Sequence, residues 1–516
     1  MIIGTHVSKY IILMSRKEIN KLRSALIAMV LLLSFSFPQS NSNGEDRAWQ
    51  TIVNGIQYRL FILSGPNNVY VARLDRQSPQ VTIDSSIAQG RVSGGLETVR
   101  AMAERNDESI SYWGEQWGGR NQVVVAINGF FYNPETGVPT SGQISSSWYA
   151  KRFDERENGS GFVWTLERAA FIGGCVVHNR SRQVITFLEN GEVQPFDNIN
   201  VPRGDDQIIL YTPQYDATTQ TADEGIEILV ELNRPLMILP SPAMVTGVVR
   251  AVRDGLGSTP IPFDHIVMSA SGSAAEIVRK TVQIGEQVGI SQEIRHLDPS
   301  CKTPNPNEWS KAFASIGASY VFLKDGVIQR LGETGQILRS ARTAVAYNQD
   351  FIFFLVVDGR DRLNSLGMSM VELAVFSNNY LGASWGTALD GGGSSTMVIQ
   401  GQLKNNPTTE AQEANSSSRH TERAVANGLM MVNILPKKIS TRFKPGDEVT
   451  IAADSEVNLR LGPGTNFPVL STLLPGSGGV VIEHVNGLNG ILAKGLYWWK
   501  VSFGEYEGWV SEEYLR

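Results

Sequence analysis

The sequence predicts an α+β protein with a mostly antiparallel β core and few helices, followed by a small C-terminal β module. Throughout residues 50–435, short apolar runs alternate with Gly, Asp, Asn and Pro, a pattern typical of many short strands. Helical spacing of apolar residues occurs in two segments, Gly95–Arg105 and Ser369–Leu381. Short strands and Gly-Pro turns continue in residues 447–516, a length that suits one small module.

Length and composition exclude several classes of protein. The chain has 516 residues, which predicts two to four domains. Its composition, with 42% apolar and 19% charged residues, excludes full disorder, a coiled coil and a collagen-like fibre. The net charge is −6 and the body of the chain has no basic block, so we expect no nucleic-acid partner. The two cysteines, Cys175 and Cys301, allow one disulfide bond or two separate buried thiols.

Residues 1–44 are predicted to be a signal peptide and leader. Basic residues between positions 16 and 23 precede the apolar run Ala25–Phe37, and a polar stretch follows. The run is shorter than the roughly 20 residues that span a bilayer, so we expect no stable membrane span after its removal. Met14 is the expected start of translation. The mature protein is therefore predicted to be secreted, periplasmic or associated with the cell wall.

Local signals define the remaining elements. Ser369 and Glu372 form a capping-box pattern, and Gly382 is placed to end that helix. Hairpins are predicted at Lys324–Val327 and at Asn190-Gly191. Residues 436–446, with two lysines and a proline, are predicted to be a linker between a domain of residues 45–435 and the C-terminal module at 447–516.

Three apolar runs of the large domain end at a polar residue followed by glycine. These polar residues are Asn128, Asp358 and Asp390. Buried strands that end in this way place functional groups at the mouth of a core, although Asn-Gly and Asp-Gly are also ordinary turn sequences. The coincidence of three such ends favours a site.

The segment Gly391–Thr396 suggests an anion site. Its three glycines leave backbone N–H groups unobstructed, and three hydroxyls follow. Arg342, Arg360 and Arg423 are candidates to clamp a phosphate, the alternative for each being an ordinary ion pair. The alternative for the glycines is a tight hairpin. No Walker loop, H-E-x-x-H, G-x-S-x-G or zinc-spaced Cys/His set is present, so carboxylates remain the acid–base candidates.

The C-terminal module resembles a bacterial SH3-like domain. The resemblance rests on four segments: Val457–Val469, Trp498–Val501, Gly508–Val510 and Tyr514-Leu515. It implies a small β-barrel and a cell-wall partner such as peptidoglycan. The alternative is that Trp498, Trp499 and Trp509 only fill the core of the barrel.

The large domain resembles the phosphodiester glycosidase family, which includes the mannose 6-phosphate uncovering enzyme. The motif core spans residues 123–432, and the segments that carry the resemblance are Ala126–Phe131, Arg342–Val345, Val357–Arg360, Gly367–Ala374, Leu389–Met397 and Arg423–Asn427. Ala341 and Ala346 depart from the family pattern, as does Asn405-Asn406-Pro407-Thr408, which bears on the substrate more than on activity.

This resemblance implies hydrolysis of the bond between a sugar anomeric carbon and a phosphodiester in a surface or extracellular polymer. Asp390, Asp358 and Glu372 are the implied catalytic carboxylates, with helix capping as the alternative for Glu372. A divalent cation such as Ca²⁺ is the one cofactor suggested, with Asp358 as a ligand. The positions expected to bind substrate or phosphate are Arg342, Thr343, Arg360, Gly391, Gly392, Gly393, Ser394, Ser395, Thr396, Asn128, Gly129, Arg423 and Asn427.

Several alternatives remain open at this point. Phe130, Tyr132 and Trp148 either stack on a sugar or pack in the core. The competing functions are a non-catalytic glycan-binding or wall-binding protein and a metal-dependent phosphodiesterase that cuts the P–O bond.

Overall fold

The computed structural model describes residues 48–153, 161–173, 177–235, 244–295, 309–330, 332, 334–407 and 421–516. All of them belong to one compact unit, Arg47–Arg516. The leader at 1–44 and both cysteines lie outside the described residues, so the signal peptide stays a prediction and both alternatives for the cysteines stay open. In the described part of the chain, no helix has the length and apolar character needed to cross a bilayer.

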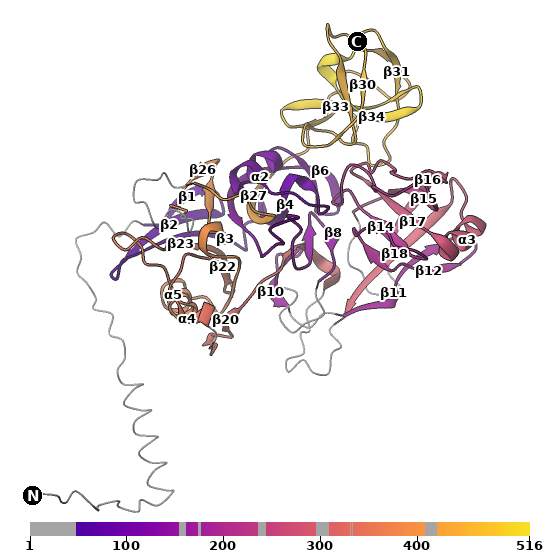
Figure 1. Ribbon diagram of the computed structural model, residues 1–516. Coiled ribbons are helices and arrows are strands. Elements are labelled where there is room, and N and C mark those ends of the chain that lie inside the picture. Colours follow the sequence, from indigo (N-terminus) through magenta and orange to yellow (C-terminus); the bar gives the residue numbers. More distant parts are fainter. Residues whose placement is uncertain are drawn as a thin grey trace, which may run out of the picture. The chain divides into compact units, whose positions relative to one another are not determined.

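Two sheets form the part of the fold that carries the candidate site (Figure 1). The first has the strand order β1-β2-β3-β23-β22-β24-β20-β21: β1 Gln50–Val53, β2 Ile56–Leu63, β3 Asn67–Asp75, β23 Phe351–Val357, β22 Arg342–Tyr347, β24 Trp385–Ala388, β20 Val321–Lys324 and β21 Val327–Ile328. The second has the order β26-β25-β6-β27-β4, with β5 beside β6: β26 Gln402–Leu403, β25 Met397–Ile399, β6 Gln116–Asn128, β27 Asn427–Leu435, β4 Val81–Ile87 and β5 Ile110–Trp113.

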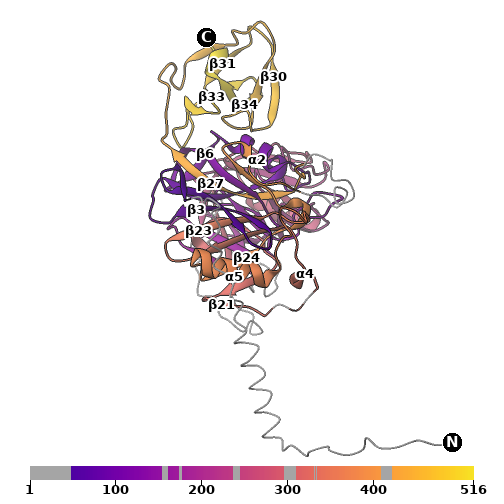
Figure 2. The ribbon, with the colours of Figure 1, turned by 90° about the vertical axis from the view of Figure 1, so that its left-hand side faces the viewer.

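Strand β23 shows how the first sheet is packed on both faces. Because successive side chains of a strand point in opposite directions, β23 is apolar on both sides. Phe353 and Leu355 pack in one cluster with Leu373 of helix α5 (Met370–Leu381). Phe354 and Val356 pack in another cluster, which contains Ile127 and Leu429 of the second sheet. Helix α2 (Val99–Asn106) covers the other side of that sheet (Figure 2).

Two further sheets and three short helical segments also belong to the main body. A five-stranded sheet has the order β10-β9-β19-β7-β8: β10 Ala170–Gly173, β9 Gly161–Thr165, β19 Ala312–Ile316, β7 Gln143–Ser145 and β8 Trp148–Lys151. An eight-stranded sheet has the order β12-β11-β18-β16-β15-β17-β14-β13: β12 Val193–Pro195, β11 Val177–Phe187, β18 Gln287–Arg295, β16 Val245–Asp254, β15 Ile226–Leu232, β17 His265–Ala270, β14 Ile208–Tyr211 and β13 Asn198–Ile199. The helical segments are η1 Ala88–Gly90, η2 Trp309–Lys311 and α4 Thr334–Ile337.

The local sequence signals are confirmed where the structure describes them. Helix α5 has the capping box of Ser369 and Glu372 and ends at Gly382, whose φ of 62° is left-handed. Strands β20 and β21 pair across Asp325-Gly326, and β11 pairs with β12 beyond Asn190-Gly191. Helix α3 (Gly272–Thr281) was not predicted. Nearly all strand pairs are antiparallel, which confirms the α+β class with a mostly antiparallel core.

The C-terminal module forms its own antiparallel sheet and packs on the main body. Its strands follow the order β28-β31-β33-β34-β29-β30, with β32 beside β33: β28 Glu448–Thr450, β31 Gly478–Val481, β33 Leu496–Phe503, β34 Tyr506–Ser511, β29 Val457–Arg460, β30 Val469–Leu473 and β32 Ile491–Ala493, and η5 Glu512–Tyr514 follows β34. Trp499 is buried in the core of the module, whereas Trp498 and Trp509 are buried in a cluster shared with the main body. The three tryptophans therefore fill cores.

A buried charged network joins the module to the main body. The carboxylate of Asp264 accepts hydrogen bonds from Nδ1 of His265 and Nε2 of His484, both at 2.6 Å. Burial alone would raise the pKa of Asp264, but the two histidines outweigh burial and hold the pKa below its ordinary value. Lys500 of the module lies 3.4 Å from Glu231 of β15. The module is thus tied to the main body by charge as well as by apolar packing.

Asp84 of β4 should make the stability of the protein depend on pH. Burial raises its pKa to about 7, although the hydroxyl and N–H of Ser146 and the N–H of Ser85 favour the carboxylate. Between its ordinary pKa of 3.8 and about 7, the folded protein holds a proton that the unfolded chain has lost, so stability falls as pH rises through this range. In the wild type, the free energy of unfolding should fall by on the order of 2 to 4 kcal/mol over this pH range because of Asp84, and Asp84→Asn should remove this change. Denaturation at several pH values measures it. An unchanged pH profile would contradict the assignment.

Candidate active site

The three polar residues that follow apolar runs lie where strands end, as the sequence predicts. Strand β6 ends at Asn128, Asp358 directly follows β23, and Asp390 follows β24 after one residue. Strand β27 begins at Asn427, and Gly428 pairs with Asn128 across the sheet. The site is therefore built where the ends of strands from the first and second sheets meet.

Asn128 connects the two sheets through its side-chain amide. Its Oδ1 accepts hydrogen bonds from Thr343 Oγ1 at 2.7 Å and from the N–H of Thr396 at 3.1 Å. Its Nδ2 donates to the carbonyl of Asp390 at 2.7 Å. The side chain is fully buried, so the structure gives Asn128 and Thr343 a positioning role in place of contact with a sugar.

Asp390 holds the central carboxylate of the site. Its backbone N–H donates to the carbonyl of Gly129 at 3.0 Å, and its side chain interacts with Ser394 and Arg423. Burial raises the pKa of this carboxyl above its ordinary value, against the opposing effects of Ser394 and Arg423. A partly exposed carboxyl with a raised pKa, next to a cation, suits acid–base chemistry.

The glycine-rich segment follows Asp390 as a short 3₁₀ turn, η3 (Gly392–Ser394). A Cβ atom on Gly392 would lie 3.2 Å from Nη2 of Arg360, and one on Gly393 would lie 2.6 Å from Nη2 of Arg423. The glycines therefore allow two guanidinium groups to lie against the turn. Arg423 also approaches Ser394, with Nη1 3.4 Å from Oγ.

The backbone N–H groups of this turn differ from the expected anion nest. Those of Gly392, Ser394 and Ser395 donate to carbonyl groups of the protein, and that of Thr396 donates to Asn128. They are thus used in holding the turn. The buried hydroxyls of Ser395 and Thr396 have no hydrogen-bond partner within the described part of the chain. The guanidinium groups that lie against the turn, more than these four amides, are therefore the candidate groups for binding an anion.

Asp358 is linked to the same turn through Asn405, a residue that the sequence did not single out for the site. Oδ1 of Asp358 accepts from Asn405 Nδ2 at 3.1 Å and from the N–H of Asn406 at 3.0 Å. Asn405 also donates to the carbonyl of Ser395 at 2.9 Å. Burial, and then the charge and hydrogen bond of Asp358, raise the pKa of Tyr70, a second residue missed from sequence. The Asn-Pro element at 405–407 was the one signal for this link.

Two predicted site residues are held by structural contacts. The guanidinium of Arg342 donates to the carbonyls of Met368 at 2.9 Å and Leu338 at 2.7 Å. Glu372 caps α5 and pairs with Arg339, and these contacts outweigh burial and lower its pKa. A carboxylate with a lowered pKa is a weaker base, and its acid form is scarce near neutral pH. The structure thus supports the capping alternative for Glu372.

Asn427 fixes the segment Gly129-Phe130 that follows strand β6. Oδ1 of Asn427 accepts from the N–H of Phe130 at 2.8 Å, and its Nδ2 donates to Gln143 at 3.1 Å. A Cβ atom on Gly129 would lie 2.3 Å from Oδ1 of Asn427, so only glycine fits there. Gln143 was not predicted, because nothing in its local sequence marks it.

The three aromatic candidates have different surroundings in the structure. Tyr132 interacts with Asp390, Arg423 and Ser394, and its hydroxyl donates to the carbonyl of Ala424 at 3.2 Å. Phe130 packs against the buried cluster between the two sheets, and Trp148 is buried elsewhere. Tyr132 is therefore the candidate aromatic side chain nearest to the carboxylate.

The surroundings of Asp358 do not fit a Ca²⁺ ion. A hard cation is bound by several oxygen ligands, whereas Oδ1 of Asp358 accepts from two nitrogen donors. Across the described ranges, a group of three His, Cys, Asp or Glu side chains close enough to share a metal occurs at Glu231, Asp264 and His484. That group belongs to the network already described, in which Lys500 contacts Glu231 and His265 contacts Asp264.

Comparison with known proteins supports the two resemblances. Residues 246–432 match the model of the phosphodiester glycosidase family, and residues 455–516 match that of the bacterial SH3 domain. The first match contains Asp358, Asp390 and Arg423, whereas Asn128 lies outside it. No curated protein matches the chain.

Solved structures of low sequence identity also resemble the chain. A hypothetical protein from Synechocystis is 18% identical with a TM-score of 0.46, and the match covers 75% of this chain and 64% of that one. A putative exported protein from Burkholderia pseudomallei is 18% identical with a TM-score of 0.45, covering 72% of this chain and 74% of that one.

The third is the catalytic domain of zebrafish N-acetylglucosamine-1-phosphodiester alpha-N-acetylglucosaminidase, auto-inhibited by its pro-peptide. It is 14% identical with a TM-score of 0.33, and the match covers 76% of this chain and 84% of that one. Residues 246–432 are thus similar to a phosphodiester glycosidase domain, and residues 455–516 are similar to a bacterial SH3 domain.

Proposed function

We propose that the protein hydrolyses the bond between a sugar anomeric carbon and a phosphodiester, releasing free sugar and a phosphomonoester. The observation that carries this proposal is the carboxyl of Asp390, partly exposed at the end of β24 and interacting with Arg423 and Ser394. A carboxylate next to a guanidinium and a hydroxyl suits a reaction in which positive charge develops on carbon while a phosphate leaves.

In this reaction, water adds to the anomeric carbon and the carbon–oxygen bond to phosphate breaks. The leaving phosphomonoester keeps the electron pair of that bond. Asp390 either takes a proton from the attacking water or stabilises the positive charge on the anomeric carbon. Arg423 and Arg360 hold the phosphate beside the glycine turn. Because phosphate is a good leaving group, a separate strong general acid is less necessary than for an alkyl glycoside.

The proposed setting is the cell envelope or the extracellular space, with a sugar-1-phosphodiester or a cell-surface glycopolymer as the substrate. Two features support this setting: the order of basic, apolar and polar segments in residues 1–44, and the match to a bacterial SH3 domain, whose proposed partner is peptidoglycan.

Isotope transfer tests the reaction directly. The purified protein is incubated with UDP-N-acetylglucosamine, and separately with a methyl phosphodiester of N-acetylglucosamine 1-phosphate, in water labelled with heavy oxygen, with and without chelator. We expect the label in the reducing sugar and none in the phosphate. Label in the phosphate would instead identify a phosphodiesterase that cuts the P–O bond. Absence of any product from a broad substrate panel, with binding to wall polymer retained, would identify a non-catalytic protein.

A further inference from the structure

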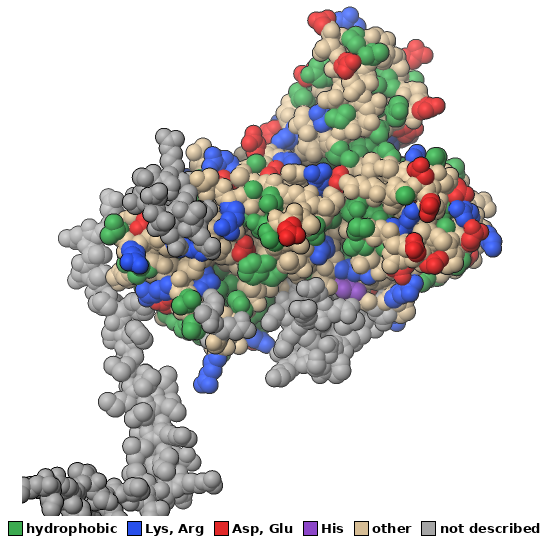
Figure 3. All heavy atoms as spheres, viewed as in Figure 1, with side chains coloured by type: hydrophobic (Ala, Val, Ile, Leu, Met, Phe, Trp, Pro, Cys, Tyr) green, Lys and Arg blue, Asp and Glu red, His purple; other side chains and the backbone are tan. Residues whose placement is uncertain are grey.

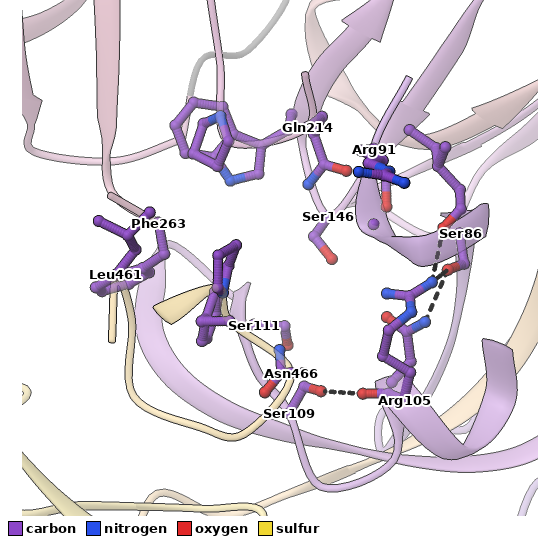
Figure 4. A pocket seen from close by; sticks show the side chains of 18 of the residues that line it. Ser86, Arg91, Arg105, Ser109, Ser111, Ser146, Gln214, Phe263, Leu461 and Asn466 are labelled. Carbon is purple, nitrogen blue, oxygen red and sulfur yellow. Dashed lines mark hydrogen bonds between the residues drawn. The ribbon is translucent and has the colours of Figure 1, made fainter. Parts of the chain in front are cut away.

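A cavity of about 410 Å³ lies where the SH3 domain meets the main body. The SH3 domain contributes residues between Leu461 and Pro468, and the main body contributes parts of β4, β5, β6, α2 and the β7–β8 hairpin. In Figure 4, Phe263 and Leu461 lie on one side of the cavity, and Ser86, Arg91 and Arg105 lie on the opposite side. The volume falls within the range of small-molecule sites.

Buried polar atoms in the cavity wall lack partners. Nε1 of Trp117 and Oδ1 of Asn121 have no hydrogen-bond partner among the described residues, and these two side chains are 7% and 4% exposed. Oδ1 of Asn466, from the SH3 domain, likewise has no hydrogen-bond partner among the described residues. Nε of Arg91 is a fourth such atom, so two donors and two acceptors on residues that line the cavity lack a partner within the described part of the chain. Buried polar groups are almost always hydrogen-bonded in native proteins, so this wall is unusual.

The charged groups of the wall are already neutralised. Arg105 pairs with Glu97 at 3.0 Å and also donates to Ser86, while Arg91 lies 3.6 Å from Asp216. The charged groups of the cavity wall are therefore matched in sign by neighbouring side chains. This balance favours a neutral ligand over a phosphate or another anion.

Aromatic rings line the cavity beside these polar atoms. Trp117 contacts Phe263 with ring centroids 5.2 Å apart, and Phe263 contacts Phe467 of the SH3 domain at 5.6 Å. The apolar C–H faces of a sugar ring pack on aromatic surfaces, while its hydroxyls donate to carbonyl oxygens and accept from an indole N–H.

We infer that this cavity binds a neutral hexose or N-acetylhexosamine unit of a glycan, and that the site is complete only when the SH3 domain is docked. The inference does not depend on the proposed hydrolysis. Ser86 in the wall pairs with Gly428, which pairs with Asn128, so the backbones at the cavity and at the candidate active site are two strand spacings, or about 10 Å, apart. A glycan held in the cavity is thus bound close to the catalytic domain's own site.

Calorimetric titration of the full chain with chitotriose, cellotriose and maltotriose tests the inference. We expect at least one of these neutral oligosaccharides to bind. Asn466→Ala and Trp117→Phe each remove one hydrogen-bonding group and should weaken binding on the order of tenfold. Because Trp117 is buried against Tyr112 and Phe263, its replacement also lowers the melting temperature, so binding is compared at a temperature at which both variants are folded. Asp390→Asn should bind like the wild type, which separates this site from catalysis.

Asn458→Ala is the matched control. Asn458 is an exposed residue of the same SH3 domain and lines a separate depression made only of SH3 residues, so its replacement should not change the affinity. The inference is overturned if none of the three sugars binds at millimolar concentration. It is equally overturned if binding survives both cavity substitutions, or if Asn458→Ala alone abolishes it.

Discussion

Replacement of Asp390 by asparagine is expected to lower kcat for sugar release on the order of 10²- to 10⁴-fold. Asparagine has the same shape but carries no charge and accepts no proton. The backbone contacts of Asp390 to Asn128 and Gly129 do not involve the carboxylate, so they remain in the variant. The melting temperature should therefore change little. Steady-state kinetics with the methyl phosphodiester of N-acetylglucosamine 1-phosphate measures the effect.

The pH dependence of the same reaction gives an independent test. Because burial raises the pKa of Asp390 above 3.8, the rate should fall on the acid side with a midpoint above that value. Arg423 favours the charged carboxylate, so Arg423→Gln should move this acid limb to higher pH. A structural role for Asp390 alone would not predict a shift of the limb.

Asp350→Asn is the control for Asp390→Asn. Asp350 is an exposed aspartate in the turn between β22 and β23 of the same sheet, so its replacement should leave kcat and its pH profile unchanged. If Asp390→Asn retained full activity, or if Asp350→Asn lost as much, the assignment of Asp390 would be wrong.

The sequence predicted which strand ends meet at the candidate site better than it predicted the contacts of each residue there. Apolar runs that stop at Asn128, Asp358 and Asp390 mark strand ends, and strand ends are set by local pattern. The roles depend on long-range contacts that no local pattern encodes. Arg342 and Arg423 look alike in the sequence, yet Arg342 holds two backbone carbonyls while Arg423 lies beside Asp390.

The features that were missed have different causes. Helix α3 buries Ala275, Val278 and Thr281, which recur at helical spacing, so this element was missed although the local pattern is present in the sequence. The wall of the interdomain cavity comes from segments between Ser86 and Pro468, which meet only in the folded chain. By contrast, the absence of a basic block was visible from composition, and Figure 3 shows acidic and basic side chains interspersed over the described part of one face.

Replacement of Asn128 by alanine should cause the largest loss of stability at the site. The substitution removes one side chain that serves three buried groups: the hydroxyl of Thr343, the N–H of Thr396 and the carbonyl of Asp390. Each buried polar group left without a partner costs about 1 to 3 kcal/mol. We therefore expect the free energy of unfolding to fall by about 3 to 6 kcal/mol, as measured by urea denaturation.

The matched control is Asn433→Ala, because Asn433 lies on β27 and its side chain donates one hydrogen bond to Gln122, at 2.9 Å. Its replacement should cost about 1 kcal/mol. Equal destabilisation by the two substitutions would show that Asn128 does not hold the site together. If the assignments are right, Asn128→Ala loses activity together with stability, since the backbone of Asp390 is released, whereas Asp390→Asn loses activity alone. The pair of variants thus separates the residue that positions the carboxylate from the carboxylate itself.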